Sequence, residues 1–246
     1  MLPAKRCTRL DQALFRLGLV SSRSQAESYI RLGQVTVDNK VIKKPGFLVG
    51  IDNTIKITAS EQFVSRAGLK LKSVAEKLKL DFKDKVVLDV GSSTGGFTDF
   101  SLSRQAKQVI AVDVGTDQLH PKLRADNRVE LHEKTDIRDF YTKQAIDIIL
   151  IDVSFISLRH VLPHIARNLA HRDTKIIAMV KPQFEASYRV KHKGVIKNDT
   201  DRRAILRDFE LWSRQYFIIE AKADSEVAGA RGNRERFYLL KKVEAN

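Results

Sequence analysis

The chain has a single cysteine, Cys7, among its 246 residues. One thiol cannot form an intramolecular disulfide, and it cannot supply a thiolate cluster for a metal ion. Chains without disulfides are typical of reducing compartments. We therefore predict a cytoplasmic protein without a metal site.

Long hydrophobic runs are missing as well. No apolar stretch approaches the roughly 18 residues that a membrane-spanning helix requires. Near the start of the chain, Arg9, Asp11 and Arg16 interrupt the apolar residues, so the pattern is not that of a secretory signal. These absences predict a protein without membrane partners.

Acidic residues are in the minority, with 30 Asp and Glu against 44 Lys and Arg, and the net charge is +14. Such an excess favours a polyanionic partner, nucleic acid before an anionic membrane. Residues 1–59 hold ten basic and four acidic residues, which gives them more than twice the charge per residue of residues 60–246. We predict a small basic domain over residues 1–59 and a larger domain over residues 60–246.

The small domain is predicted to contain two helices and a hairpin. Leucines at helical spacing predict a first helix, running through Leu17 and ended by Gly18, and Ser24 with Glu27 forms a capping-box pattern that opens a second. Valines on both sides of Asp38-Asn39-Lys40 indicate the hairpin. Four arginines lie on or beside the helices: Arg9, Arg16, Arg23 and Arg31. They form either a solvated face or an RNA contact, and arginine favours RNA because a guanidinium stacks and binds phosphate through two hydrogen bonds.

The larger domain is organised around a predicted buried strand, Val86–Val90, and the turn after it, which contains Gly91, Ser92, Gly95 and Gly96. Glycines let backbone N–H groups approach a ligand that side chains would exclude. The spacing matches neither the dinucleotide-binding motif nor the P-loop, and the glycines alone fit a tight turn in any α/β fold equally well.

A second apolar strand ends at Asp113, about 20 residues further on. An acid at that place suits ribose hydroxyls, and no basic residue stands beside Asp113 to bind an additional phosphate. The two strands therefore predict an adenosine-type cofactor such as S-adenosylmethionine.

Apolar strands alternate with helical segments through the rest of the chain, which predicts a doubly wound, Rossmann-like α/β sheet. The predicted strand ends carry four charged side chains: Asp89, Asp113, Asp152 and Lys181. Ligands bind at the carboxyl ends of strands in such sheets, so we expect these side chains on one rim.

The first domain resembles the small α+β S4 RNA-binding domain over roughly residues 8–58. The resemblance rests on Arg9-Leu10-Asp11-x-x-Leu14, Ser22-Arg23-Ser24-x-Ala26, Ile30-x-x-Gly33-x-Val35-x-Val37-Asp38 and Lys43-x-Pro45.

Residues 63–240 resemble ribose 2′-O-methyltransferases of the FtsJ type, and the whole chain resembles the TlyA family of rRNA cytidine 2′-O-methyltransferases. The matching stretches are Val64-Ser65-Arg66-x-x-x-Lys70-Leu71, Asp89 to Asp99, Asp152 to Leu158, Lys181-Pro182-Gln183-Phe184-Glu185 and Gly232-Asn233-Arg234-Glu235. The resemblance implies S-adenosylmethionine as cofactor and ribosomal RNA or ribosomal subunits as partners.

The same resemblance implies a catalytic tetrad of Lys70, Asp152, Lys181 and Glu235. We expect the cofactor to contact residues of the glycine turn and of the strand ends. These residues are Asp89, Gly91, Ser92, Gly95, Gly96, Phe97, Asp113, Asp136 and Asp152. Residues 187–198 have no helical or strand period, so we expect a charged loop that is either solvated or closes over RNA. The further candidate RNA ligands are Arg66, Arg189, Lys191 and Lys193.

The chemistry explains why two lysines are needed. A ribose hydroxyl is a poor nucleophile until it loses its proton, and a lysine accepts that proton more readily when a second ammonium stands nearby. We expect Lys181 to be the base and Lys70 to supply the second positive charge beside it. Asp152 is expected to hold both lysines in place, and Glu235 to orient Lys70 or the hydroxyl. The pattern alone leaves another interpretation open, in which Lys70 is a solvated lysine and Lys181 with Asp152 is an ordinary ion pair.

Two other functions stay open at this point. A non-catalytic RNA-binding or ribosome-assembly factor would keep the fold without the chemistry, and the intact tetrad argues against it. Members of the family are often named hemolysins, but the sequence has neither a secretory signal nor a lytic helix to support a membrane-active protein.

Overall fold

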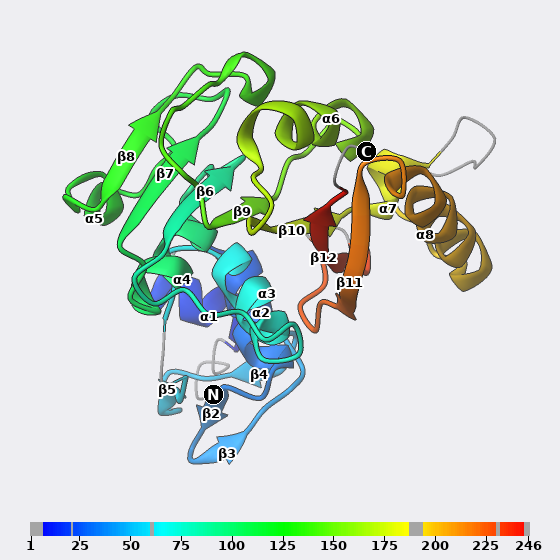
Figure 1. Cartoon of the computed structure of the whole chain (residues 1–246). Helices are drawn as coiled ribbons and strands as arrows, with labels where there is room; N and C mark the ends of the chain where they lie inside the picture. Colours follow the sequence, from blue (N-terminus) through cyan, green and yellow to red (C-terminus); the bar gives the residue numbers. More distant parts are fainter. Residues whose placement is uncertain (1–6, 21, 60–61, 187–193, 230–231, 244–246) are drawn as a thin grey trace, which may run out of the picture.

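A seven-stranded sheet lies at the centre of the computed structural model, which describes residues 7–20, 22–59, 62–186, 194–229 and 232–243 (Figure 1). The strand order is β11-β12-β10-β9-β6-β7-β8. The strands are β6 (Val86–Val90), β7 (Gln108–Val112), β8 (Val129–His132), β9 (Ile148–Ile151), β10 (Lys175–Val180), β11 (Phe217–Asp224) and β12 (Arg236–Lys242). β10, β9, β6, β7 and β8 pair in parallel, and β12 runs antiparallel between β10 and β11. The predicted doubly wound α/β sheet is confirmed.

The strand order reverses between β6 and β9. The chain proceeds from β6 through β7 to β8 on one side, and it continues through β9 and β10 on the other. A crevice opens beyond the carboxyl ends of the strands at such a switch point. Asp89 lies in β6 and Asp152 follows β9 directly, so both side chains lie beside the crevice.

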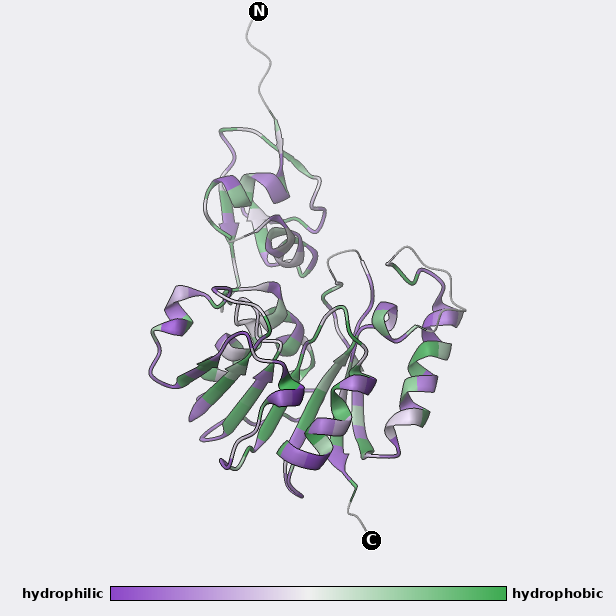
Figure 2. Ribbon diagram, turned by 90° about the horizontal axis from the view of Figure 1, so that it is seen from above, coloured by the Kyte–Doolittle hydropathy of each residue, from purple (hydrophilic) through white to green (hydrophobic). Residues whose placement is uncertain are grey.

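Helices cover both faces of the sheet, which explains why its inner strands are apolar on both sides. One face packs against α3 (Arg66–Ala75), α4 (Gly96–Ser103) and α5 (Pro121–Arg124). The other face packs against η2 (Leu158–His160), α6 (Leu162–His164), η3 (Ile165–Leu169) and α8 (Asp199–Ser213). Figure 2 shows the hydrophobic strands enclosed between these layers. The remaining short elements are η1 (Ile137–Asp139) and α7 (Pro182–Glu185).

The N-terminal region contains α1 (Leu10–Arg16), α2 (Arg23–Arg31), a sheet of β3 (Lys40–Val41), β2 (Val35–Val37) and β5 (Ile55–Ile57), and a pair of β1 (Thr8–Arg9) and β4 (Leu48–Val49). The predicted hairpin is confirmed, because β2 pairs with β3 and both Asp38 and Asn39 adopt left-handed turn conformations. Two helix boundaries differ from the prediction. α2 begins earlier than predicted, because Ser22 caps it by accepting a hydrogen bond from the backbone N–H of Gln25. Leu17 lies beyond the end of α1 with its side chain exposed.

The N-terminal region and the sheet region share one apolar core. Leu10 and Ile30 belong to the same buried cluster as Phe63 and Leu71, and α2 lies against α3. The Gln25 side chain donates a 2.6 Å hydrogen bond to the backbone carbonyl of Phe63 across this junction. The N-terminal region therefore holds α3 against the sheet.

Candidate active site

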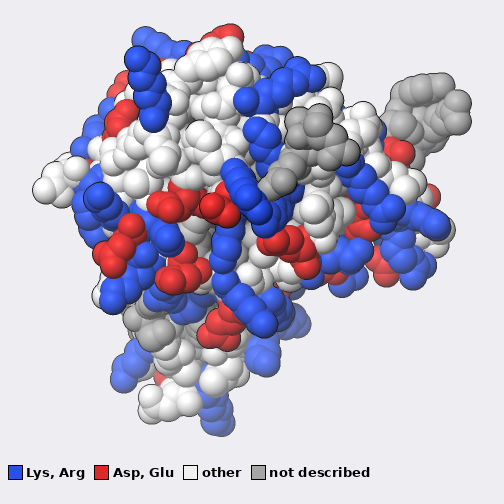
Figure 3. All heavy atoms as spheres, in the orientation of Figure 1, with Lys and Arg blue, Asp and Glu red and all other residues white. Residues whose placement is uncertain are grey.

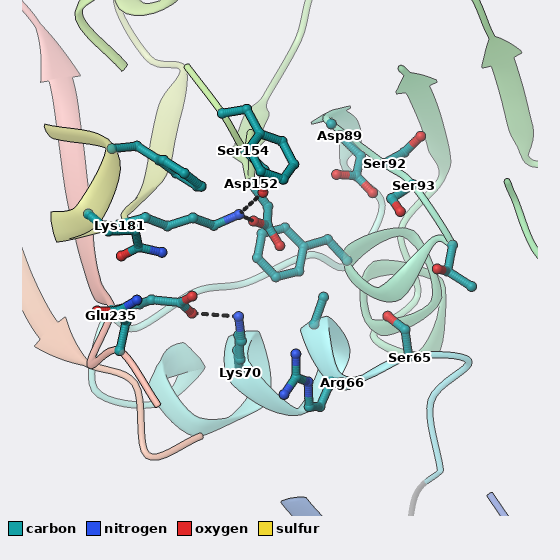
Figure 4. A pocket seen from close by; sticks show the side chains of 18 of the residues that line it. Ser65, Arg66, Lys70, Asp89, Ser92, Ser93, Asp152, Ser154, Lys181 and Glu235 are labelled. Carbon is teal, nitrogen blue, oxygen red and sulfur yellow. Dashed lines mark hydrogen bonds and ion pairs between the residues drawn. The ribbon is translucent and has the colours of Figure 1, made fainter. Parts of the chain in front are cut away.

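A cavity of about 640 Å³ lies at the switch point of the sheet (Figure 4). Its walls come from the turn after β6, from α3, from the loop after β9 and from the end of β10. Ser22 of the N-terminal region also lines it. The cavity thus combines segments that are far apart in the sequence.

Two lysine–carboxylate pairs face this cavity. The Nζ atom of Lys181 lies 2.5 Å from Oδ1 of Asp152 and donates a 2.6 Å hydrogen bond to the Ser154 hydroxyl. The Nζ atom of Lys70 lies 2.5 Å from Oε2 of Glu235. Figure 4 shows both lysines pointing into the cavity, Lys181 from the end of β10 and Lys70 from α3. The four residues of the expected tetrad are therefore in one place.

The fold explains how these side chains come together. Asp152 and Lys181 follow the adjacent parallel strands β9 and β10, so both emerge at the same edge of the sheet. Glu235 precedes β12, which pairs with β10 up to Val180. Lys70 belongs to α3, which the N-terminal region covers on its outer side.

The structure excludes the alternative of a solvated Lys70. Its side chain is 8% exposed and that of Glu235 is 3% exposed, so this ion pair is buried. The charges are also arranged differently from the expectation that Asp152 holds both lysines. Asp152 pairs with Lys181, whereas Lys70 pairs with Glu235. Lys70 was one of the two partners expected for Glu235.

Gly91, Gly95 and Gly96 of the turn after β6 were all expected to contact the cofactor, but the structure gives them different surroundings. Gly91 lines the cavity, and a Cβ atom there would lie 2.8 Å from the backbone oxygen of Asp152. A Cβ atom on Gly95 would instead collide with Leu123 of α5, and one on Gly96 with the Ser65 hydroxyl. Gly95 and Gly96 allow the turn to pack against its neighbours, and they do not line the cavity.

Two polar groups beneath the turn have atoms without a partner among the residues that the structure describes. Asp89 is buried and accepts a 2.7 Å hydrogen bond from the Thr98 hydroxyl through Oδ2. Its Oδ1 atom has no partner within the described part of the chain. Burial raises the pKa of Asp89 to about 7. The buried Ser92 hydroxyl also has no partner in the described ranges. Because unpartnered buried polar atoms are costly, these groups are suited to an amino and a carboxylate group of a ligand.

An adjoining cavity of about 350 Å³ shares Gly91, Ser93 and Asp152 with the first. Its walls are mostly apolar and include Asp113 and Asp136. Asp113 accepts hydrogen bonds from the backbone N–H groups of Ser93 and Gly115 at 2.8 and 2.7 Å, so it also holds the glycine turn. Hydrogen bonds from Arg138 lower the pKa of Asp136 to about 2. Apolar walls with carboxylates at the strand ends fit an adenosine.

Comparison with known proteins decides the family. The family model for FtsJ-like methyltransferase matches residues 63–242, and that for the S4 domain matches residues 8–55. The first match spans most of the chain. The chain belongs to the FtsJ-like methyltransferase family.

The relatives of this methyltransferase agree with that assignment. "23S rRNA (cytidine-2'-O)-methyltransferase TlyA" of Campylobacter jejuni is 43% identical over 73% of this chain and 71% of the relative. "16S/23S rRNA (cytidine-2'-O)-methyltransferase TlyA" of Mycobacterium tuberculosis is 40% identical over 96% of this chain and 90% of the relative. A solved structure, "Putative hemolysin from Streptococcus thermophilus", superposes with a TM-score of 0.72 at 33% identity and covers 98% of this chain and 90% of that one. These names do not favour a non-catalytic RNA-binding factor.

Within the described ranges, no helix of this methyltransferase is long and apolar enough to cross a membrane. Nor do three or more His, Cys, Asp or Glu side chains gather there in a way that could hold a metal ion.

Sequence reasoning missed several residues at the mouth of the methyltransferase cavity. Phe155 is 92% exposed with a left-handed backbone, and its ring centre lies 5.4 Å from that of Phe184. Both rings line the cavity, together with Gln183 and Asn233. The available signal for Phe155 was an aromatic residue three positions after the strand-end acid Asp152.

The candidate RNA ligands of the methyltransferase have different environments. Arg9 and Arg23 are half exposed, and both pair with the buried carboxylate of Asp11. Arg16 and Arg31 are exposed, whereas Arg66 lines the cavity. The remaining candidates lie outside the described residues: Arg189, Lys191 and Lys193.

Proposed function

We propose that this methyltransferase transfers a methyl group from S-adenosylmethionine to the ribose 2′-hydroxyl of a cytidine in ribosomal RNA. The observation that carries the proposal is the placement of Lys181, whose amine enters the cavity between Asp152 and Ser154. The names of relatives at 40–43% identity support rRNA and cytidine as the substrate.

The cofactor, when bound, supplies a sulfonium methyl group that an oxygen nucleophile can attack. In its neutral form, the Lys181 amine accepts the proton of the 2′-hydroxyl at its Nζ atom and becomes an ammonium, while the oxygen is left as the nucleophile. Asp152 and Ser154 hold the Nζ atom in place. The Lys70–Glu235 pair fixes a second charged group at the same cavity. Phe155 offers an exposed ring on which a base of the RNA stacks. Base catalysis contributes about 10²–10⁴-fold to such reactions, and positioning contributes more.

We assign the methionine end of the cofactor to the first cavity, beside Asp89 and Ser92, whose unpartnered atoms suit its amino and carboxylate groups. The adenosine end belongs in the adjoining cavity with Asp113 and Asp136. Gly91 borders both cavities, so its backbone faces the cofactor.

The variant Gly91→Ala tests this assignment. Gly91 and Gly232 both have left-handed backbones, so alanine at either position is expected to cost about 1–2 kcal/mol of unfolding free energy. Only at Gly91 would the new Cβ atom also press on the Asp152 backbone, whereas at Gly232 it meets open space. We expect Gly91→Ala alone to weaken cofactor binding, about tenfold or more. Urea denaturation and calorimetric titration measure the two effects, and equal cofactor affinities in both variants would contradict the assignment.

We propose that the N-terminal region, with a boundary between residues 59 and 60, delivers the RNA in the cytoplasm. Lys and Arg side chains are scattered over both the N-terminal region and the sheet region on the face shown in Figure 3, and several acidic side chains lie near its middle. Asp11 orients the guanidinium groups of Arg9 and Arg23 while leaving both half exposed for phosphate. A polyanion can therefore contact both regions.

Substitution Arg23→Gln tests this role without leaving Asp11 unpaired, because Arg9 keeps its two hydrogen bonds to that carboxylate. If Arg23 neutralises one phosphate, the plot of log affinity against log salt becomes shallower in Arg23→Gln, by about 0.7–0.9 in slope. The rRNA affinity of this variant also falls several-fold at moderate salt. Arg128→Gln is the control, since Arg128 pairs with Asp126 near β8, far along the sheet from the cavity. Filter binding over a salt series measures both variants, and identical slopes for wild type and Arg23→Gln would refute the contact.

Product analysis tests the reaction itself. Purified protein is incubated with unmodified rRNA and S-adenosylmethionine carrying a labelled methyl group, and the RNA is then digested to nucleosides. The proposal expects the label in 2′-O-methylcytidine. Label on a base, or cofactor binding without transfer, would refute it, and the second outcome would favour the non-catalytic factor.

A further inference from the structure

Gln183 presents an unused hydrogen-bond acceptor to the cavity. Its Oε1 atom is buried and has no partner among the described residues, and the residue lines the same cavity as Lys181. The proposed methyl transfer makes no use of this group. A buried acceptor without a donor is costly, so its place in the cavity wall indicates that a ligand supplies the donor.

The segment that carries Gln183 is held on both sides. Before it, Lys181 is fixed by Asp152 and Ser154. After it, the buried Glu185 accepts hydrogen bonds from the Ser157 hydroxyl at 2.6 Å and from the backbone N–H of Leu158 at 2.7 Å. The amide is therefore presented on a rigid support, which limits what it can accept.

The charge of the cavity narrows the choice of donor. The lysines at this site are already matched by carboxylates, so a neutral amide beside them suits a neutral ligand group rather than another ion. Gln183 is two residues from Lys181 and next to Phe184, whose ring contacts that of Phe155. A base that stacks on the aromatic pair while its ribose faces Lys181 would bring its polar edge to Gln183.

We propose that Gln183 reads the base of the target nucleotide by accepting a hydrogen bond from the exocyclic amine of cytosine. This inference rests on the proposed ribose methylation and adds the residue that selects the base. Cytosine has a donor at this position, whereas uracil has a carbonyl oxygen, which would face the Gln183 oxygen as a second unpaired acceptor. The site therefore prefers cytidine over uridine.

The test compares rRNA transcripts that carry C or U at the methylated position, once product analysis has located it. We expect wild type to methylate the C transcript with kcat/KM about tenfold or more above that of the U transcript. Gln183→Leu removes the acceptor at similar size, and the C/U ratio is expected to fall toward one, mainly through loss on C. Gln215→Leu, at an exposed site, serves as the control and keeps both rates.

Gln183→Glu keeps an acceptor at the same place, so its C/U ratio is expected to stay at or above that of wild type. This variant decides the question if Gln183→Leu does not fold. A wild-type ratio near one, an unchanged ratio in Gln183→Leu, or a ratio near one in Gln183→Glu would overturn the inference while leaving ribose methylation intact. If wild type methylates neither transcript, nor any other ribose, the proposed function itself fails.

Discussion

Lys181→Arg is expected to reduce single-turnover methylation nearly as far as Lys181→Ala, by about 10²–10⁴-fold, while cofactor binding survives in both variants. Arginine keeps the positive charge and can still pair with Asp152, which lies 2.5 Å from the lysine amine. A guanidinium stays protonated because its pKa lies above about 12, so it cannot accept the proton of the 2′-hydroxyl. Conserving the charge therefore does not conserve the reaction.

In the opposite interpretation, Lys181 only forms a structural ion pair with Asp152. The methylation rate of Lys181→Arg would then be close to that of wild type. Lys175→Arg at the exposed start of β10 is the matched control and should keep full activity. Rates are measured with rRNA and cofactor saturating, and calorimetry reports cofactor binding. A wild-type rate in Lys181→Arg would end the assignment of Lys181 as the base.

Glu235→Leu is expected to lower the free energy of unfolding by about 3–5 kcal/mol and to abolish methylation. The cause is Lys70, which is 8% exposed and would remain buried without its partner. The double variant Lys70→Met/Glu235→Leu removes both charges and should recover most of the stability, because a buried ion pair is often replaceable by apolar side chains. Its activity should stay lost if the pair takes part in the reaction.

Urea denaturation of the wild type, Lys70→Met, Glu235→Leu and the double variant completes a double-mutant cycle. Strictly additive losses of stability would show that the two residues are not coupled. Recovery of methylation together with stability would show that the pair only supports the fold. Either result would contradict the account of this pair.

The strand-end residues could be predicted because they follow from local pattern. Asp152 and Lys181 each close a short apolar run, and parallel strands bring such ends to one edge. The position of Lys70 could not be predicted in this way. Its burial depends on the N-terminal region covering α3, and helical periodicity places Lys70 off the apolar stripe that faces the sheet.

The family resemblance implied that Glu235 orients Lys70 or the hydroxyl, but the periodicity of the sequence did not contain the sheet topology that brings Glu235 and Lys70 together. Glu235 reaches the cavity because β12 inserts between β10 and β11. The surroundings of Gly95 depended on where α5 packs, which lies outside the motif itself. The buried oxygen of Gln183 likewise became visible only once the cavity was formed.

The most direct test of the central claim is mass spectrometry of rRNA nucleosides from cells that lack the gene. These cells are complemented with wild type or with Lys181→Arg, expressed at equal levels. The account predicts that 2′-O-methylcytidine is lost without the gene, returns with wild type and does not return with Lys181→Arg. Nucleoside levels that do not depend on the gene, or full restoration by Lys181→Arg, would contradict it.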